Sequence, residues 1–159
     1  MMRTAIVERP IDPAALIAEV SGVTNGATLL FVGTVRETND GRDVSGMDYT
    51  AYRGMAEREL ADIVGEASSR FDTSDIVVEH RLGTLGLGEA SVAIAVAHPH
   101  RGRAYEANRY IIEELKKRVP IWKLEHYLDG TREWVAADGS KRAPQGEAAV
   151  LNDERRAEP

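Results

Sequence analysis

Hydrophobic positions along the chain follow two different periods, and this predicts a mixture of strands and helices. Apolar residues that alternate with polar ones, or that form short β-branched runs, predict strands at residues 3–8, 28–36, 47–52, 76–82, 91–97, 121–128 and 132–135. Apolar residues that recur every three to four positions predict helices at residues 14–20, 55–71 and 104–118. Because strands follow strands as well as helices, the pattern favours the α+β class.

Turn-forming residues mark several boundaries of these elements. Asp12 followed by Pro13 predicts a helix N-cap with proline at the first helical position. The apolar run 28–36 predicts a central strand covered on both faces, and Gly33 within it predicts a bulge or a close approach by another backbone. The polar stretch 37–45 predicts a mobile loop. The glycine-rich stretch 83–88 precedes a strand rather than a helix, so it predicts a β-connection and not a phosphate-binding loop.

Length and composition predict one domain over residues 1–136 and a disordered, charged tail over residues 137–159. The net charge of −6 argues against a general nucleic-acid binder. The absence of cysteine excludes disulfides, thiolate metal sites and a cysteine nucleophile, and it is compatible with the cytoplasm. No apolar run approaches the roughly 18 residues of a membrane span, and we expect no signal peptide.

The segment 115–123 carries the strongest chemical signal. It ends an amphipathic helix at Pro120 and starts an extended stretch, because proline stops a helix and pushes the preceding residue towards extended geometry. Lys116 and Lys123 lie on opposite sides of Pro120 and could converge on one pocket. Two clustered amines disfavour each other's charge, so one of them could be neutral and reactive. Helical spacing places Lys116 beside the buried stripe and Lys117 on the solvated side.

Three further candidates, Arg36, His100 and Arg101, lie at the ends of predicted core elements, where binding sites are usually built. Together with the two lysines they could form a shared anion pocket; the alternative is five ordinary surface charges. We expect no metal site, since His98 and His100 lack a nearby third ligand. Trp122 beside Lys123 could stack on a flat heterocycle, but a core position is favoured.

These residues, in this order and spacing, resemble the large, catalytic subunit of molybdopterin synthase over about residues 5–135. The matching segments are 31–36, 80–83 with 88–89, 100–101, 115–125, 129–130 and 134–135. The resemblance implies an α/β-hammerhead fold with a mixed, largely antiparallel sheet. It also implies a cytoplasmic homodimer, in which each copy binds a small ubiquitin-like sulfur carrier that ends in Gly-Gly, giving a heterotetramer.

The implied reaction belongs to molybdenum cofactor biosynthesis and uses no cofactor. Sulfur from the carrier's C-terminal thiocarboxylate is added twice to cyclic pyranopterin monophosphate (precursor Z), which gives the dithiolene of molybdopterin. The resemblance makes Lys116 and Lys123 the catalytic lysines, with Lys116 an acid/base or transient covalent partner. Arg36, His100 and Arg101 suit the anionic substrate.

Two departures and two alternatives accompany this resemblance. Leu124 stands where many relatives carry another basic residue, and Asp138 stands where some relatives place an arginine. This puts in doubt a basic contribution from the C-terminal region but not the two lysines. One alternative is a non-catalytic module that only binds a ubiquitin-like partner. The other is an enzyme that acts on a different phosphorylated heterocycle. Retention of both lysines favours the sulfurtransferase, since a pure binding module has no need of them.

Overall fold

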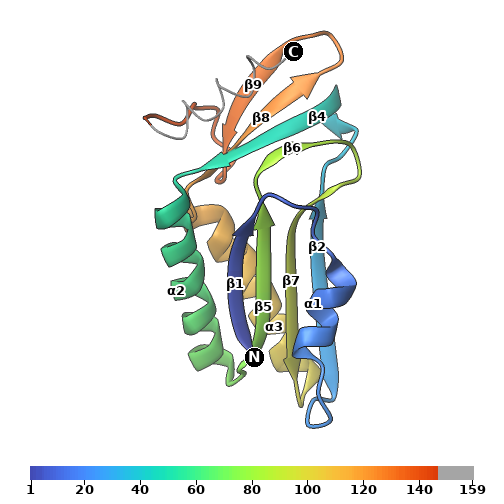
Figure 1. The fold of residues 1–159 in the computed structure, drawn as a ribbon, viewed down its shortest axis with the longest axis vertical. Helices are drawn as coiled ribbons and strands as arrows, with labels where there is room; N and C mark the ends of the chain where they lie inside the picture. The colour runs from blue at the N-terminus through green and yellow to red at the C-terminus, as the bar shows by residue number, and fades with distance from the viewer. Residues whose placement is uncertain (147–159) are drawn as a thin grey trace.

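The computed structural model describes residues 1–146 and confirms the α+β class (Figure 1). Its elements, in chain order, are β1 (Met2–Val7), α1 (Pro13–Val20), β2 (Ala27–Thr34), β3 (Thr38–Asn39), β4 (Arg42–Ala51), α2 (Arg53–Phe71), β5 (Asp75–Arg81), β6 (Gly83–Leu85), β7 (Ala90–His98), α3 (Arg101–Arg118), β8 (Ile121–Tyr127) and β9 (Arg132–Ala136).

Two sheets lie one above the other along the long axis of the molecule (Figure 1). The lower sheet has the strand order β1-β5-β7-β2, and only its β1–β5 pair is parallel. The upper sheet has the order β3-β4-β8-β9, with β6 added against β4, and all of its described pairs are antiparallel. The pairing is therefore mixed and largely antiparallel, as expected.

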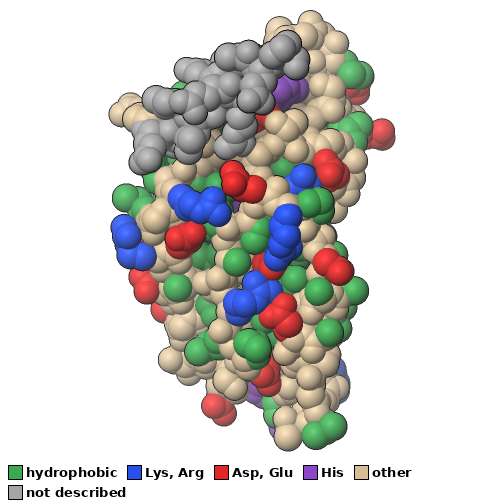
Figure 2. Space-filling view, in the orientation of Figure 1, with side chains coloured by type: hydrophobic (Ala, Val, Ile, Leu, Met, Phe, Trp, Pro, Cys, Tyr) green, Lys and Arg blue, Asp and Glu red, His purple; other side chains and the backbone are tan. Residues whose placement is uncertain are grey.

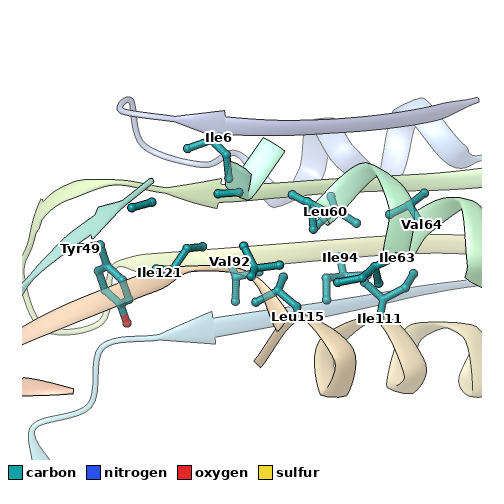
Figure 3. Packing of buried hydrophobic residues seen from close by; sticks show 14 of the residues in the cluster. Ile6, Tyr49, Leu60, Ile63, Val64, Val92, Ile94, Ile111, Leu115 and Ile121 are labelled. Carbon is teal, nitrogen blue, oxygen red and sulfur yellow. The ribbon is translucent and has the colours of Figure 1, made fainter. Parts of the chain in front are cut away.

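Helices cover both faces of the lower sheet. Helices α2 and α3 pack on one face through a continuous apolar core, part of which Figure 3 shows with Leu60 and Ile63 from α2 and Ile111 from α3 around Ile94 of β7. On the other face, α1 contributes a smaller apolar cluster with β5 and β7. The alternation of side chains along β5 and β7 divides their residues between these two cores. The core thus extends up α3 to the junction with the upper sheet.

The helix ends follow the predicted chemistry. The Asp12 carboxylate accepts hydrogen bonds from the backbone N–H groups of Ala14 (3.0 Å) and Ala15 (3.3 Å), which confirms the N-cap of α1. Helix α3 ends at Arg118, and Val119 is already extended before Pro120, as predicted. Its start was predicted three residues late, because Arg101, Gly102 and Arg103 are exposed and carry no apolar periodicity.

The predicted central position of the 28–36 strand is wrong. Strand β2 lies at the edge of the lower sheet, beside β7 only, and none of its residues is fully buried. Phe31 is 36% exposed. An apolar run reports a strand's hydrophobicity but not its neighbours in the sheet, and the central positions belong to β5 and β7.

The predicted mobile loop at 37–45 is also wrong, because these residues form a β-hairpin. Strand β3 pairs with the first residues of β4, with Asn39 opposite Arg42. The two residues between them, Asp40 and Gly41, both have positive φ (50° and 74°). This is the backbone geometry of a two-residue hairpin turn, for which Asp-Gly is a preferred sequence. Strand β4 is therefore longer than predicted, and Met47 to Ala51 are buried.

Of the two alternatives predicted for Gly33, the bulge is confirmed, whereas the atoms that approach Gly33 belong to side chains and not to another backbone. The register between β2 and β7 shifts between Gly33 and Thr34, as in a β-bulge. A Cβ atom on Gly33 would lie 2.8 Å from Cγ1 of Val92. The glycine-rich stretch at 83–88 forms β6 and a turn into β7, which confirms the predicted β-connection.

Residues 137–146, the described part of the predicted tail, fold back over the upper sheet. The Ala136 N–H donates to the carbonyl of Ser140 (2.8 Å), which closes a turn. The Gln145 N–H donates to the Tyr52 hydroxyl (2.9 Å), and the Arg142 guanidinium lies 5.7 Å from the centre of the Trp122 ring. The rest of the predicted tail, 147–159, lies outside the described residues.

The surface carries mixed charge. Figure 2 shows basic and acidic side chains interspersed on one face of the molecule. Arg3 of β1 and Arg9 both contact the buried carboxylate of Glu79 on β5. Of the helices in the described part of the chain, none is long and apolar enough to cross a bilayer.

Candidate active site

A cavity of about 80 Å³ lies where the end of α3 meets β4, β8 and β9. Its lining includes Lys116 and Lys123, so their predicted convergence on one pocket is confirmed; their catalytic roles stay predictions. We call this cavity the lysine pocket. The other residues that line it are Tyr49, His80, Leu115, Ile121, Trp122, Val135, Ala136, Ala137 and Gly139.

The turn at Pro120 produces this convergence. Lys116 lies in the last turn of α3, and the Val119 N–H closes that turn by donating to the carbonyl of Leu115 (3.1 Å). After Pro120 the chain enters β8, where Lys123 lies between Tyr49 of β4 and Val135 of β9. A lysine on a helix end and a lysine on a strand thus reach the same cavity from two directions.

Lys123 has a fixed counter-charge. Its amine lies 2.9 Å from Oε1 of Glu125, a carboxylate with no exposed surface. The Asn39 amide donates to both carboxylate oxygens (2.8 and 2.9 Å), and the Tyr127 hydroxyl donates to Oε2. Burial by itself raises the pKa of Glu125, but the hydrogen bonds from Tyr127, Lys123 and Asn39 outweigh it, so the pKa lies below its ordinary value. Glu125 therefore stays ionised beside the Lys123 ammonium.

Lys116 has no such partner. It forms no ion pair with any residue in the range 1–146. The residue as a whole is exposed, as Lys117 is, but the protein atoms around its amine partly desolvate it. This burial, and secondly the positive charge of Lys123, lower the pKa of Lys116 below the ordinary lysine value. The two lysines therefore differ: Lys123 is paired with a buried carboxylate, and the lowered pKa of Lys116 shifts it towards the neutral, nucleophilic amine.

His80 is a buried member of the pocket that the sequence interpretation did not assign to it. Its side chain is 2% exposed and packs edge-on against the Tyr49 ring at 5.4 Å between centroids. Burial first, and then the charge of Lys116, lower the pKa of His80 to about 3, so the imidazole is neutral. The alternation of β5 contained the missed signal, since His80 lies on the same strand face as Ile76 and Val78, towards α3.

Arg36 lies near the lysine pocket without lining it. Its guanidinium donates to Oδ1 of Asn39 (3.0 Å), and Asn39 in turn donates to Glu125. Arg36 is thus linked to Lys123 through two side chains, Asn39 and Glu125.

His100 and Arg101 lie at the opposite end of α3. They line a separate hollow with Gly26, Pro99 and Gly102. At about 1.5 Å per residue, the helix separates Arg101 from Lys116 by roughly 20 Å. The expected anion pocket that joins all five candidates is therefore not formed within one chain.

The two remaining sequence candidates are structural. The Nδ1 atom of His98 accepts a hydrogen bond from the His100 N–H (2.8 Å), and His98 is buried. Trp122 is 7% exposed and packs edge-on against Tyr52, so the favoured core position is confirmed. Among residues 1–146, no cluster of three or more histidine, aspartate or glutamate side chains could hold a metal ion.

Comparisons with known proteins agree with the sequence resemblance. The family model described as MoaE protein matches residues 6–118. A relative from Thermoplasma volcanium, named molybdopterin synthase catalytic subunit, is 44% identical over 129 residues, which are 81% of this chain and 94% of the relative. A crystal structure of molybdopterin synthase from Staphylococcus aureus has a TM-score of 0.77 at 38% identity and covers 81% of this chain and 93% of that chain.

A more distant structure carries the same fold. It is a protein–protein complex of subunits 1 and 2 of molybdopterin-converting factor from Helicobacter pylori. Its TM-score is 0.67 at 22% identity, with 81% of this chain and 87% of that chain covered. At this identity the similarity shows the fold alone.

Proposed function

Because the chain belongs to the MoaE family, we propose that it is the catalytic subunit of a molybdopterin synthase. It transfers sulfur from the C-terminal thiocarboxylate of a small carrier protein to cyclic pyranopterin monophosphate. One observation carries this proposal above the others: two lysines share one cavity, and within residues 1–146 only Lys123 has a carboxylate partner. A module that only binds a ubiquitin-like protein has no use for a desolvated, unpaired amine.

Lys116 acts on the carrier's acyl group. The thiocarboxylate sulfur adds to an electrophilic carbon of the pterin side chain, and the electron pair displaced from that carbon moves to its oxygen, which takes a proton from Lys123. The carrier is then joined to the pterin through an acyl–sulfur bond. The neutral Lys116 amine either takes a proton from the water that attacks this acyl carbon, or attacks the carbon itself. In both cases the bond between the carrier's acyl carbon and the sulfur breaks. Its electron pair stays on the sulfur, which remains bonded to the pterin.

Lys123 acts on the pterin as a cation and proton donor. The ion pair with Glu125 keeps its ammonium beside the cavity and restricts its rotamers. A positioned ammonium stabilises negative charge that develops on the substrate, and it does so most strongly where water is excluded. The buried carboxylate and its hydrogen bonds from Asn39 and Tyr127 thus support the reacting group from behind.

The size of the lysine pocket supports a homodimer. At about 80 Å³ it is smaller than the roughly 300–1,000 Å³ of sites that enclose a small organic ligand. It suits the end of a glycine chain, whereas the pterin has to extend outside it. His100 and Arg101, too distant in their own chain, are free to bind the substrate phosphate at the pocket of a second copy. Arg36, which lies on the Lys123 side, would complete that anion site.

The carrier is proposed to be a small ubiquitin-like protein that ends in Gly-Gly. Small side chains, Ala136, Ala137 and Gly139, form one wall of the pocket and leave room for an extended, unbranched terminus. Two carriers on a central homodimer give a heterotetramer. We place this reaction in the cytoplasm.

A single-turnover assay tests the proposal. Purified protein is mixed with thiocarboxylated carrier and precursor Z, and product is followed as its fluorescent oxidation derivative. Carrier binding is measured in parallel by isothermal calorimetry. Binding together with product supports the synthase. Binding without product, under conditions where a known synthase makes product, supports the non-catalytic module. If the protein neither binds the carrier nor makes product, an enzyme for another phosphorylated heterocycle is supported instead.

A further inference from the structure

His80 is a buried ionisable side chain of the lysine pocket that the proposed reaction does not yet use. It lies on β5, and the residues that precede it on the same strand face, Ile76 and Val78, are fully buried and apolar. A buried imidazole is costly to desolvate unless its nitrogen atoms are used. The contacts of these two nitrogens therefore indicate what His80 does.

The Nδ1 contact determines the tautomer. Nδ1 lies 3.0 Å from the backbone carbonyl oxygen of Arg81. A carbonyl oxygen only accepts hydrogen bonds, so Nδ1 carries the ring proton and donates it. The lone pair of the neutral ring is consequently on Nε2. The edge-on packing against Tyr49 restrains the ring plane.

Nε2 is the ring nitrogen of His80 that makes no hydrogen bond within residues 1–146. Two fully enclosed side-chain nitrogens in this range lack a partner, Nε of Arg81 and Nε1 of Trp122, and Nε2 of His80 is not among them. Because Nδ1 is engaged by Arg81 and His80 lines the lysine pocket, Nε2 is the ring nitrogen left for a group in that cavity. A hydrogen-bond acceptor is thus available in the pocket that Lys116 also lines.

The surrounding charges keep His80 an acceptor. The other ionisable side chains of the pocket are Tyr49 from β4, Lys116 from α3 and Lys123 from β8, whereas β9 and residues 137–139 contribute none to its lining. Glu125 is already engaged by Lys123. Among the described residues, no carboxylate lines the pocket to stabilise a protonated imidazole, and the pKa of His80, lowered to about 3, agrees with a neutral ring.

We propose that His80 is a positioning residue for Lys116: its Nε2 accepts a hydrogen bond from the Lys116 amine and directs the nitrogen towards the carrier terminus. The two side chains line one cavity without a hydrogen bond between them, and the flexible stem of Lys116 brings the amine inward when the carrier enters. A neutral amine can donate one N–H to Nε2 while its lone pair points at the acyl carbon. The catalytic consequence rests on the proposed function; the contact itself does not.

Two substitutions separate positioning from packing. In His80→Asn the amide nitrogen can take the place of Nδ1 and still donate to Arg81, but nothing replaces Nε2. In His80→Gln the longer side chain brings its amide oxygen close to the Nε2 position and restores an acceptor. Both variants are neutral, polar and of similar size. Their circular dichroism and thermal midpoints check that they fold alike.

The readout is the pH dependence of Lys116 acetylation, followed by peptide mass spectrometry with the exposed Lys117 as internal reference. This measurement needs neither carrier nor pterin. In His80→Asn the ammonium form loses a charge-assisted hydrogen bond, so the labelling midpoint of Lys116 falls by roughly half a unit to one unit. In His80→Gln it returns to the wild-type value. Single-turnover rates follow, with a loss of about tenfold in His80→Asn that His80→Gln largely restores.

Identical labelling midpoints of Lys116 in the wild type and both variants would overturn the proposal. Equal shifts of this midpoint in His80→Asn and His80→Gln would overturn it too. A midpoint shift confined to His80→Asn in a protein that makes no product would uphold the positioning contact and refute the proposed function instead.

Discussion

Replacing Glu125 by glutamine tests the electrostatic difference between the two lysines. The carboxylate is fully buried and receives contacts from Lys123, Asn39 and Tyr127. Glutamine removes the charge and places an N–H₂ group opposite one donor. Asn39 cannot simply flip, because its oxygen accepts from Arg36.

The magnitude follows from these contacts. Hydrogen bonds that involve a charged group contribute about 1.5–3 kcal/mol each. The variant loses the ion pair and one Asn39 hydrogen bond, but it no longer has to bury a carboxylate, and Lys123 is 26% exposed and can turn to solvent. We expect a net loss of about 2 kcal/mol in the free energy of unfolding.

Urea denaturation at pH 7 measures this loss. With an m-value of about 2 kcal/mol/M, the midpoint falls by about 1 M. Glu113→Gln is the matched control, since Glu113 is exposed and pairs with Arg109 in the same helix, and it changes stability by no more than about 0.5 kcal/mol. A Glu125→Gln midpoint that coincides with the wild type would refute the reasoning.

The difference in the free energy of unfolding between the wild type and Glu125→Gln changes with pH in a definite direction. The pKa of Glu125 is lower in the folded protein than its ordinary value, so the unfolded chain binds more protons in the interval between the two pKa values. The stability that ionised Glu125 contributes is therefore fully present above about pH 4.5 and is lost as the pH falls through the folded-state pKa. The gap between wild type and Glu125→Gln narrows below that pH, and a gap that widens contradicts the assignment.

Three further substitutions test the fold, each by thermal or urea denaturation. Gly33→Ala places a Cβ 2.8 Å from Cγ1 of Val92 and lowers stability by about 1–3 kcal/mol. An unchanged midpoint would show that β2 can move enough to relieve this contact without loss of stability. Gly65→Ala is its counterpart, since no atom lies within 4 Å of the new Cβ in α2, and it raises stability by up to about 1 kcal/mol; a loss would mean that α2 is more closely packed there. Asp12→Ala removes the cap of α1 and costs about 1 kcal/mol, which Asp12→Ser largely restores; equal losses in both would argue against capping.

The parts of the fold that the sequence predicted well depend on local chemistry. The Asp12 cap, the periodicity of α2 and the end of α3 before Pro120 involve residues close in the chain. The convergence of Lys116 and Lys123 belongs to the same class, because one turn separates a helix end from a strand start. Such features need no knowledge of which strands are neighbours.

The parts that failed depend on distant neighbours or on a neglected turn. The edge position of β2 is set by where β5 and β7 lie, which its own apolar run does not encode. The position of His80 in the pocket depends on which face of the lower sheet α3 covers, but the alternation of β5 already indicated the strand face on which His80 lies. The Asp40-Gly41 hairpin was readable too, since Asp-Gly is a specific turn signal. The separation of Arg101 from Lys116 follows from helix length alone.

The central claim is that the desolvated, unpaired amine of Lys116 takes part in sulfur transfer. The most direct measurement is the single-turnover rate of Lys116→Ala beside that of Lys117→Ala, its exposed neighbour, which pairs only with Glu114 within the described chain. We expect Lys116→Ala to lose about 10²–10⁴-fold in rate with carrier binding intact, and Lys117→Ala to match the wild type. Equal rates in Lys116→Ala and the wild type would contradict the account.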